Sequence, residues 1–181
     1  FRGMTKDGAA LNSAIEARER GDAVGAIVHS ARALQINPEY EDAFILFAQY
    51  YPASVDGLKK EAEGIAAGKA SDPFFNDRLI GVYEKLATID AALAGLPPKV
   101  TNPDTKQSIA IVREPVDYRA KALEARNAAA EAHYAAAEAH YAAAEARLPG
   151  DSIAAKQEIL AEYGRALSLV KPYKDASAKS A

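Results

Sequence analysis

The stretch that decides the fold is RGDAVGAIVHSARALQINPEYEDA, residues 20–43. Gly21-Asp22 breaks one helix, and the Asp22 carboxylate is expected to cap the next by accepting backbone N–H bonds. Apolar residues then recur at helical spacing over residues 23–36, which predicts an amphipathic helix. Asn37-Pro38 ends that helix, because proline has no N–H to donate and restricts the residue before it.

The same signals (caps, apolar spacing and helix breakers) occur before and after this stretch. They predict a chain of helices separated by proline and glycine. No segment alternates with period two over a convincing length, so the fold class is all-α. Pro52 is expected to end one helix, and residues 95–116 are expected to form one long Pro-rich connecting loop with a short extended piece near residues 109–112. The predicted helices cover residues 12–20, 23–36, 41–51, 56–68, 74–94, 117–147 and 153–170.

Residues 20–43 resemble the second helix of a tetratricopeptide repeat. In that family a Gly-Asp pair opens the helix, small residues let two helices touch, and a proline ends the unit. Ala26 and Ala33 lie seven residues apart on one face, as close helix packing requires. The separation of Pro38 and Pro73 is also close to the family period of about 34 residues. Residues 162–176 echo the same unit in degenerate form.

The resemblance implies one helical-repeat domain over residues 1–181, built from stacked helical hairpins. Residues 8–73 would form two tetratricopeptide-like units, followed by a helix at 74–94 and the loop at 95–116. Residues 117–172 would form a long helical hairpin, and residues 173–181 a frayed tail. The resemblance also implies a groove lined by the first helix of each pair, with Asp42, Ile45 and Gln49 as its positions in the second unit.

One helix is unusually long and rich in alanine, and it contains a duplication. Residues 130–136 and 137–143 both read AEAHYAA. Seven residues make nearly two helical turns, so each copy keeps its faces in register. Tyr134 and Tyr141 therefore lie beside glutamates on one face, and His133 and His140 form part of a second, basic stripe that is solvated or faces an interface.

The two histidines do not predict a metal site. They lie about 10.5 Å apart along the helix axis, whereas one metal ion needs nitrogens at about 2 Å. Alanine surfaces pack tightly on other helices, so most of this helix is expected to pack on residues 153–170. The protruding turns are expected to contact a partner.

The composition excludes several function classes. The formal net charge of −3 leaves no excess positive charge to neutralise a phosphate backbone, so nucleic acid is not an expected partner. The chain has no cysteine, which removes thiolate metal sites and cysteine nucleophiles. Residues 64–70 match a phosphate-binding loop poorly, and no other catalytic motif occurs. We therefore expect no enzyme activity, no cofactor and no metal.

Two functions remain open at this point. The first is a protein-protein interaction or scaffold module, with Asp42, Ile45, Gln49, Tyr83, His133, Tyr134, His140 and Tyr141 as candidate partner-binding residues. The alternative is a helical protein that encloses a small apolar molecule between its aromatic side chains and the Pro-rich loop. A closed pocket of several hundred cubic ångströms would favour the alternative, and an open groove would favour the first.

The expected location is the bacterial cell envelope. The chain begins with Phe1 rather than methionine, which fits removal of a secretory signal or of a lipoprotein leader that had carried a lipid anchor. Simple trimming fits equally well, so a cytoplasmic location stays open. Self-association also stays open, because the terminal pairs of a helical array need capping.

Overall fold

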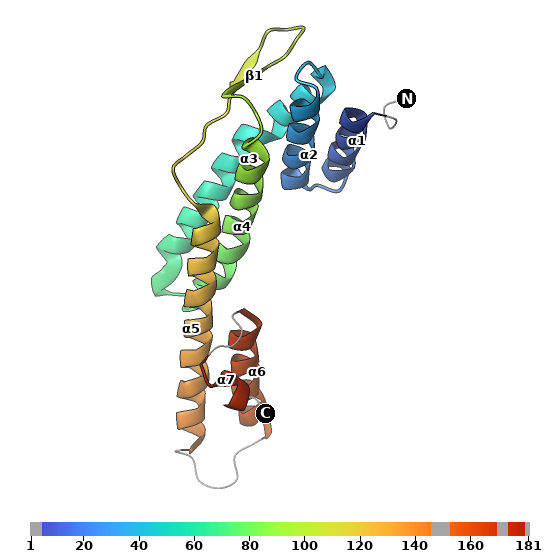
Figure 1. Ribbon diagram of the computed structural model, residues 1–181. Coiled ribbons are helices and arrows are strands. Elements are labelled where there is room, and N and C mark those ends of the chain that lie inside the picture. The colour runs from blue at the N-terminus through green and yellow to red at the C-terminus, as the bar shows by residue number, and fades with distance from the viewer. Residues whose placement is uncertain (1–4, 146–152, 170–173, 180–181) are drawn as a thin grey trace. The chain divides into compact units, whose positions relative to one another are not determined.

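The computed structural model of the protein describes residues 5–145, 153–169 and 174–179, which are mostly helical (Figure 1). The all-α prediction is confirmed at this level, with a small two-stranded sheet as the exception. Contacts divide the chain into two compact units, where the sequence predicts one domain. The first unit comprises Phe1–Ala62 with Val82–Tyr118, and the second comprises Glu63–Gly81 with Arg119–Ala181.

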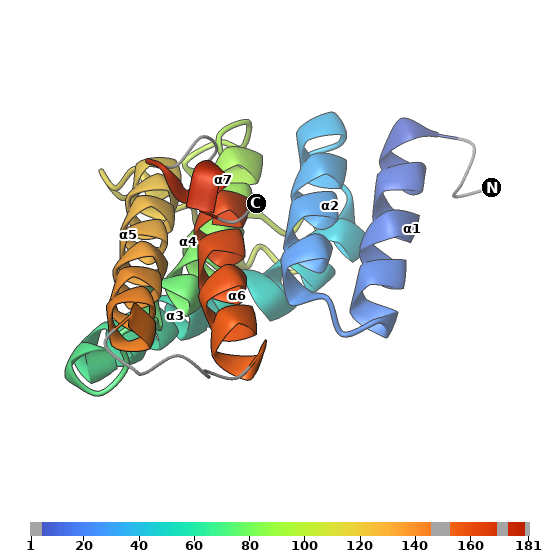
Figure 2. The ribbon, with the colours of Figure 1, turned by 90° about the horizontal axis from the view of Figure 1, so that it is seen from below.

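The first unit begins with a helical hairpin of α1 (Lys6–Glu19) and α2 (Ala23–Ile36), which lie side by side (Figures 1 and 2). The expected cap is confirmed, because the Gly25 N–H donates to Asp22 Oδ1 at 2.8 Å. Ala26 and Ala33 are fully buried, as close packing of the two helices predicts. The predicted start of α1 at residue 12 is wrong, since Thr5 already caps the helix by accepting from the Gly8 N–H at 3.2 Å.

The predicted break at Pro52 is wrong. Residues Glu41–Ala67 form one continuous helix, α3, with Pro52 in its interior, and a short 3-10 turn at Gly68–Ala70 follows. The second predicted tetratricopeptide-like unit is therefore not a helix pair with a turn near residue 52. The reason is that the buried stripe keeps its helical spacing on both sides of the proline, while Pro52 itself is exposed. The buried residues of this stripe are Phe44, Phe47, Tyr51, Leu58, Ala62 and Ile65.

We expect Pro52→Ala to stabilise the protein by about 1–2 kcal/mol. A proline costs about 3 kcal/mol in a helix interior, and its stiffening of the unfolded chain offsets up to about 1 kcal/mol of that. Alanine would also restore the N–H that residue 52 lacks as a donor to the carbonyl of Ala48. Urea denaturation followed by circular dichroism measures the change, and an unchanged or lower midpoint would show that α3 has adapted fully to the proline.

Residues 95–116 contain a β-hairpin, of which the sequence predicts only a short extended piece near residues 109–112. Strands β1 (Lys99–Thr101) and β2 (Ser108–Ala110) follow α4 (Phe75–Leu93) and pair in antiparallel register. Asn102, which is buried, shapes the turn between them: its Oδ1 accepts from the N–H groups of Asp104 at 2.8 Å and Thr105 at 2.9 Å. The prediction of one long loop is therefore corrected to a β-hairpin with flanking connections.

The end of this segment is anchored on α3 and α4. One guanidinium nitrogen of Arg113, Nη2, lies 2.8–3.1 Å from the carbonyl oxygens of Leu93, Ala94 and Leu96 at the end of α4, where a cation is favourable. Lys59 of α3 forms an ion pair with Glu114 at 2.5 Å. These contacts explain why a sequence rich in proline holds a defined conformation.

In the second unit, α5 (Tyr118–Glu145) lies beside α6 (Ile153–Leu169), and α7 (Ala176–Lys179) contacts α6 (Figures 1 and 2). Buried Ala137 of α5 packs against Ile159 and Tyr163 of α6. At Ala137 the alanine-rich helix therefore packs on residues 153–170, as the sequence predicts. The prediction of a frayed tail is corrected for residues 174–179, which form a turn and a short helix. None of the described helices is both long enough and apolar enough to span a membrane.

Candidate functional site

An open groove runs along the α1–α2 hairpin. Its volume is about 580 Å³. The residues of α1 that line it follow one another at intervals of three, one and three residues, and those of α2 at intervals of three and four. Residues at this spacing lie on one face of a helix, so each helix contributes one face. The groove is lined by Lys6, Ala9, Ala10, Ser13, His29, Arg32 and Ile36.

The groove combines basic side chains with an apolar surface. Lys6 and Arg32 are exposed, and neither forms an ion pair with a residue that the structure describes. Ile36 is 44% exposed, and none of the described residues that line the groove carries a carboxylate. Asp7, next to Lys6 in the chain, accepts a hydrogen bond from Asn37 at 3.1 Å. Hydrogen bonds from Thr5 and then Asn37 lower the pKa of Asp7, so its charge is already engaged.

The groove positions implied by the family resemblance lie elsewhere, on α3. Asp42, Ile45 and Gln49 share one face of that helix, opposite the buried stripe, and do not line the α1–α2 groove. Ile45 is 51% exposed, whereas Asp42 is half-buried and has interactions of its own. The sequence therefore predicts one exposed face, at Ile45, but not the basic groove. The spacing of Lys6, Ala9 and Ser13 was a signal for it that the late helix start concealed.

A second pocket of the first unit is smaller than a typical small-molecule site. It lies among aromatic and aliphatic side chains that include Tyr51, Leu86 and Tyr118, and encloses about 30 Å³. That volume is about the share of one water molecule, not the several hundred cubic ångströms of a small-molecule site. Burial and then the bond to Glu114 raise the pKa of Tyr118 to about 12. Tyr83 packs near it, with ring centroids 6.5 Å apart.

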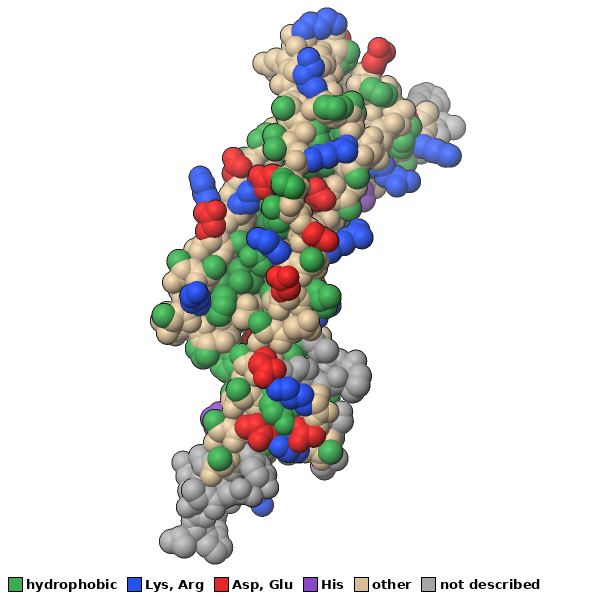
Figure 3. Space-filling view, turned by 60° about the vertical axis from the view of Figure 1, so that its left-hand side comes forward, with side chains coloured by type: hydrophobic (Ala, Val, Ile, Leu, Met, Phe, Trp, Pro, Cys, Tyr) green, Lys and Arg blue, Asp and Glu red, His purple; other side chains and the backbone are tan. Residues whose placement is uncertain are grey.

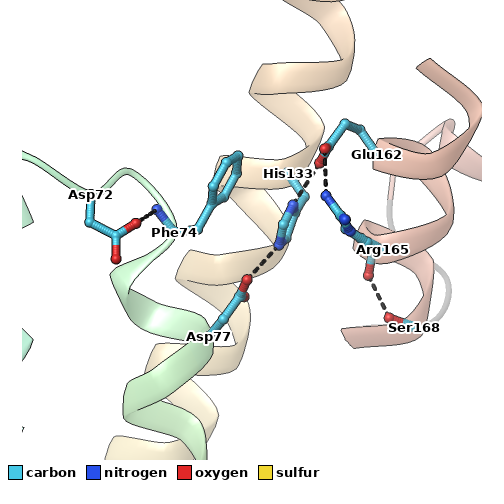
Figure 4. Close-up of polar contacts among 7 residues, drawn as sticks. All are labelled: Asp72, Phe74, Asp77, His133, Glu162, Arg165 and Ser168. Atoms are coloured by element: carbon cyan, nitrogen blue, oxygen red, sulfur yellow. Dashed lines mark hydrogen bonds and ion pairs between the residues drawn. The ribbon is translucent and has the colours of Figure 1, made fainter. Parts of the chain in front are cut away.

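The second unit holds a buried histidine between two carboxylates (Figure 4). His133 of α5 is 3% exposed; its Nε2 lies 2.8 Å from Asp77 Oδ2 of α4, and its Nδ1 lies 2.7 Å from Glu162 Oε2 of α6. The Phe74 ring stacks on the imidazole with centroids 4.5 Å apart and planes 10° apart. Arg165 donates to the other oxygen of Glu162 at 2.7 Å, so this carboxylate bridges two basic groups.

This arrangement corrects the prediction for His133, which was expected on a solvated or partner-facing stripe. Its side chain is inside the molecule, and both ring nitrogens face carboxylate oxygens. A neutral imidazole has only one N–H donor, so the arrangement is satisfied by the imidazolium or by a proton on one carboxyl group. Because both nitrogens are engaged, neither is available as a general base or as a metal ligand. His140, one heptad later, is exposed as predicted.

Tyr134 is half-buried and lies under the C-terminal segment. Its hydroxyl donates to Asp175, and Lys174 Nζ lies 4.7 Å from its ring centroid. The bond to Asp175 raises the pKa of Tyr134 and lowers that of Asp175. Tyr134 thus contacts the chain's own tail where a partner was expected. The side chain of Tyr141 lies outside the described residues, so its predicted role stays untested.

Comparisons with models of known protein families, with curated proteins and with solved structures found no match. Among the described residues, no group of three or more potential ligands is arranged to hold a metal ion. The features of the described residues that bear on function are the basic groove of the first unit and the surfaces of the second.

Proposed function

We propose that the chain is a non-catalytic protein-interaction module and that the α1–α2 groove binds an acidic segment of a protein partner. The observation that carries the proposal is the lining of this groove, in which the described residues supply basic groups at Lys6, His29 and Arg32 and apolar alanines but no carboxylate. A segment with apolar residues on one side and carboxylates at its edges would be complementary in shape and charge.

The α1–α2 pair also supports a tetratricopeptide-like arrangement for this part of the chain. Its two helices have 14 residues each and meet through fully buried alanines. In stacked helical repeats each helix pair packs against the neighbouring pair, so a groove along one pair is a surface on which a further helix can pack. A partner helix in this groove would extend the array by one element. The location at the cell envelope, with or without a lipid anchor, remains a prediction from the sequence.

The exposed face of α3 at Ile45 is a second surface within the same proposal. The groove and this face are distinguished by substitution, because they share no residue. A partner that occupies the groove is sensitive to Lys6 and Arg32, whereas one on α3 is sensitive to Ile45.

Selection of random 12-residue peptides against the immobilised full chain tests the proposal. We expect enriched peptides to be acidic and amphipathic, and to bind the Lys6→Glu/Arg32→Glu variant at least about tenfold more weakly, because reversed charges in a site repel the ligand. The matched control is Lys60→Glu/Lys85→Glu, which makes the same change of charge at two exposed lysines of other helices. Equal loss of binding in both variants would indicate nonspecific attraction, and no loss in either would refute the groove.

A further inference from the structure

The C-terminal segment covers a face of the second unit that is made of tyrosines and glutamates. Lys174 pairs with Glu131 of α5 at 2.7 Å, and Lys179 pairs with Glu138 of α5. Glu131 and Glu138 hold the same position in consecutive heptads, so they lie about 10.5 Å apart along one face of α5. The two lysines of the tail therefore match two carboxylates presented at heptad spacing.

Aromatic rings lie between these carboxylates. The Tyr134 and Tyr163 rings meet edge to face with centroids 5.9 Å apart, and Lys179 lies 5.6–5.8 Å from both ring centroids. The Tyr163 hydroxyl donates to Glu138 at 2.6 Å. Burial and then this bond raise the pKa of Tyr163 to about 12, and Lys179 followed by Tyr163 lowers the pKa of Glu138. The face thus offers ring faces and carboxylates together, the groups that best attract an ammonium ion.

Part of the attachment of the tail comes from exposed charges. Glu131 is 61% exposed and Lys174 is 45% exposed in their pair, and exposed pairs stabilise little because water and salt screen them. Helix α7 has only four residues, too few to be stable without its contacts. In Figure 3, acidic and basic side chains lie close together around apolar atoms in the lower part of the view, where Figure 1 draws α5 and α7.

We infer that the Tyr134–Glu138–Tyr163 face is a binding surface for a lysine-bearing segment of a protein partner, and that residues 174–179 are an internal occupant which such a segment displaces. The chemistry of the tail defines the partner: two lysines five residues apart, with a carboxylate next to the first. The attachment of the tail keeps its local concentration in the millimolar range. A partner segment therefore binds only if it outcompetes the attached tail for this face. The tail is thus an autoinhibitory contact.

This inference is independent of the α1–α2 groove, which has the opposite charge and involves other helices. A partner of the groove is acidic, whereas a partner of this face is basic. Failure of one proposal therefore leaves the other standing.

The test uses a capped peptide of the tail sequence, Lys-Asp-Ala-Ser-Ala-Lys, and the full chain with its own tail reversed by Lys174→Glu/Lys179→Glu. We expect the peptide to shift the NMR signals of Tyr134, Glu138 and Tyr163 in this variant, with an apparent Kd at least about tenfold lower than for the unchanged chain. Lys60→Glu/Lys85→Glu, which keeps the tail, is the matched receptor control and is expected to behave like the unchanged chain. A peptide with both lysines replaced by glutamate is expected not to bind.

Other outcomes overturn the inference. Equal affinity for the reversed and the unchanged chain means that the tail does not occupy the face, and shifts outside the face place the binding elsewhere. Binding of the glutamate peptide with similar affinity means that the face does not recognise lysine. If the reversed variant does not fold, Lys174→Gln/Lys179→Gln removes the same charges without adding new ones, and the same peptide comparison decides.

Discussion

His133→Ala is expected to lower the free energy of unfolding by about 3 kcal/mol. Removing one partner of a buried ion pair costs about 3–5 kcal/mol when the group left behind has no other partner, whereas Glu162 here keeps its hydrogen bond from Arg165. Here Glu162 loses its 2.7 Å contact and Asp77 its 2.8 Å contact in a single substitution. The lower end of the range applies because Asp77 is partly exposed and regains contact with water.

The duplication supplies the control for this prediction. His140→Ala makes the same chemical change within an identical heptad, but at an exposed position. It is expected to change the free energy of unfolding by less than about 0.5 kcal/mol. Urea denaturation with circular dichroism measures both variants. Equal effects would mean that the His133 network does not stabilise the protein and that helix propensity dominates instead.

A double substitution separates the network from the loss of packing against Phe74. Adding Glu162→Gln to His133→Ala removes the carboxylate that the first change leaves without its histidine. We expect the double variant to be about 1 kcal/mol more stable than the sum of the two single effects predicts, since contacting residues couple by roughly this amount. Strict additivity would assign the whole effect of His133→Ala to lost packing.

The contrast between His133 and His140 shows what periodicity can and cannot predict. Two identical heptads give identical local signals, so the sequence places both histidines on one stripe. Burial depends on what lies opposite, and the groups opposite His133 come from Phe74, Asp77 and Glu162, at least 29 residues away in the chain. No local pattern carries that information. The all-helical class and the packing of α5 on α6, by contrast, follow from apolar spacing and are confirmed.

Helix ends were predicted best where a cap and a stop act together. The predicted range of α2, residues 23–36, is the observed one, because Asp22 caps its start and Asn37-Pro38 closes its end. At Pro52 the two signals conflict, since the proline opposes helix while the apolar spacing continues. Burial of the stripe outweighs the cost of one exposed proline. The spacing across a proline is therefore a better guide to continuity than the proline itself.

The prediction for the Pro-rich segment, residues 95–116, was incomplete for a different reason. Strands β1 and β2 have three residues each, too few to show a period of two, so the sequence predicts only a short extended piece near the second of them. Asn102-Pro103, between the two strands, is a pair that favours turn initiation. The anchoring by Arg113 and Glu114 depends on carbonyls and a lysine brought close by folding. The basic groove could not be predicted for the same reason, because it exists only once α1 and α2 are paired.

Phe47→Ala is expected to lower the free energy of unfolding by about 4 kcal/mol. Phe47 is fully buried and its ring stacks on Tyr51, with centroids 4.9 Å apart and planes 18° apart. Replacing a buried phenylalanine by alanine costs about 3–5 kcal/mol, through lost transfer energy and the cavity that remains. The stacked pair adds to this cost, since aromatic pairs contribute beyond their buried area.

Ile45→Ala on the same helix is the matched comparison, because Ile45 lies two residues away on the exposed face. We expect it to change stability by less than about 0.5 kcal/mol. If Ile45 belongs to a partner surface, this variant loses peptide binding at unchanged stability, and Phe47→Ala loses stability first. A large destabilisation by Ile45→Ala would mean that this face of α3 is covered by the protein itself. The face would then no longer be a candidate surface, and the α1–α2 groove would remain as the interaction site of the first unit.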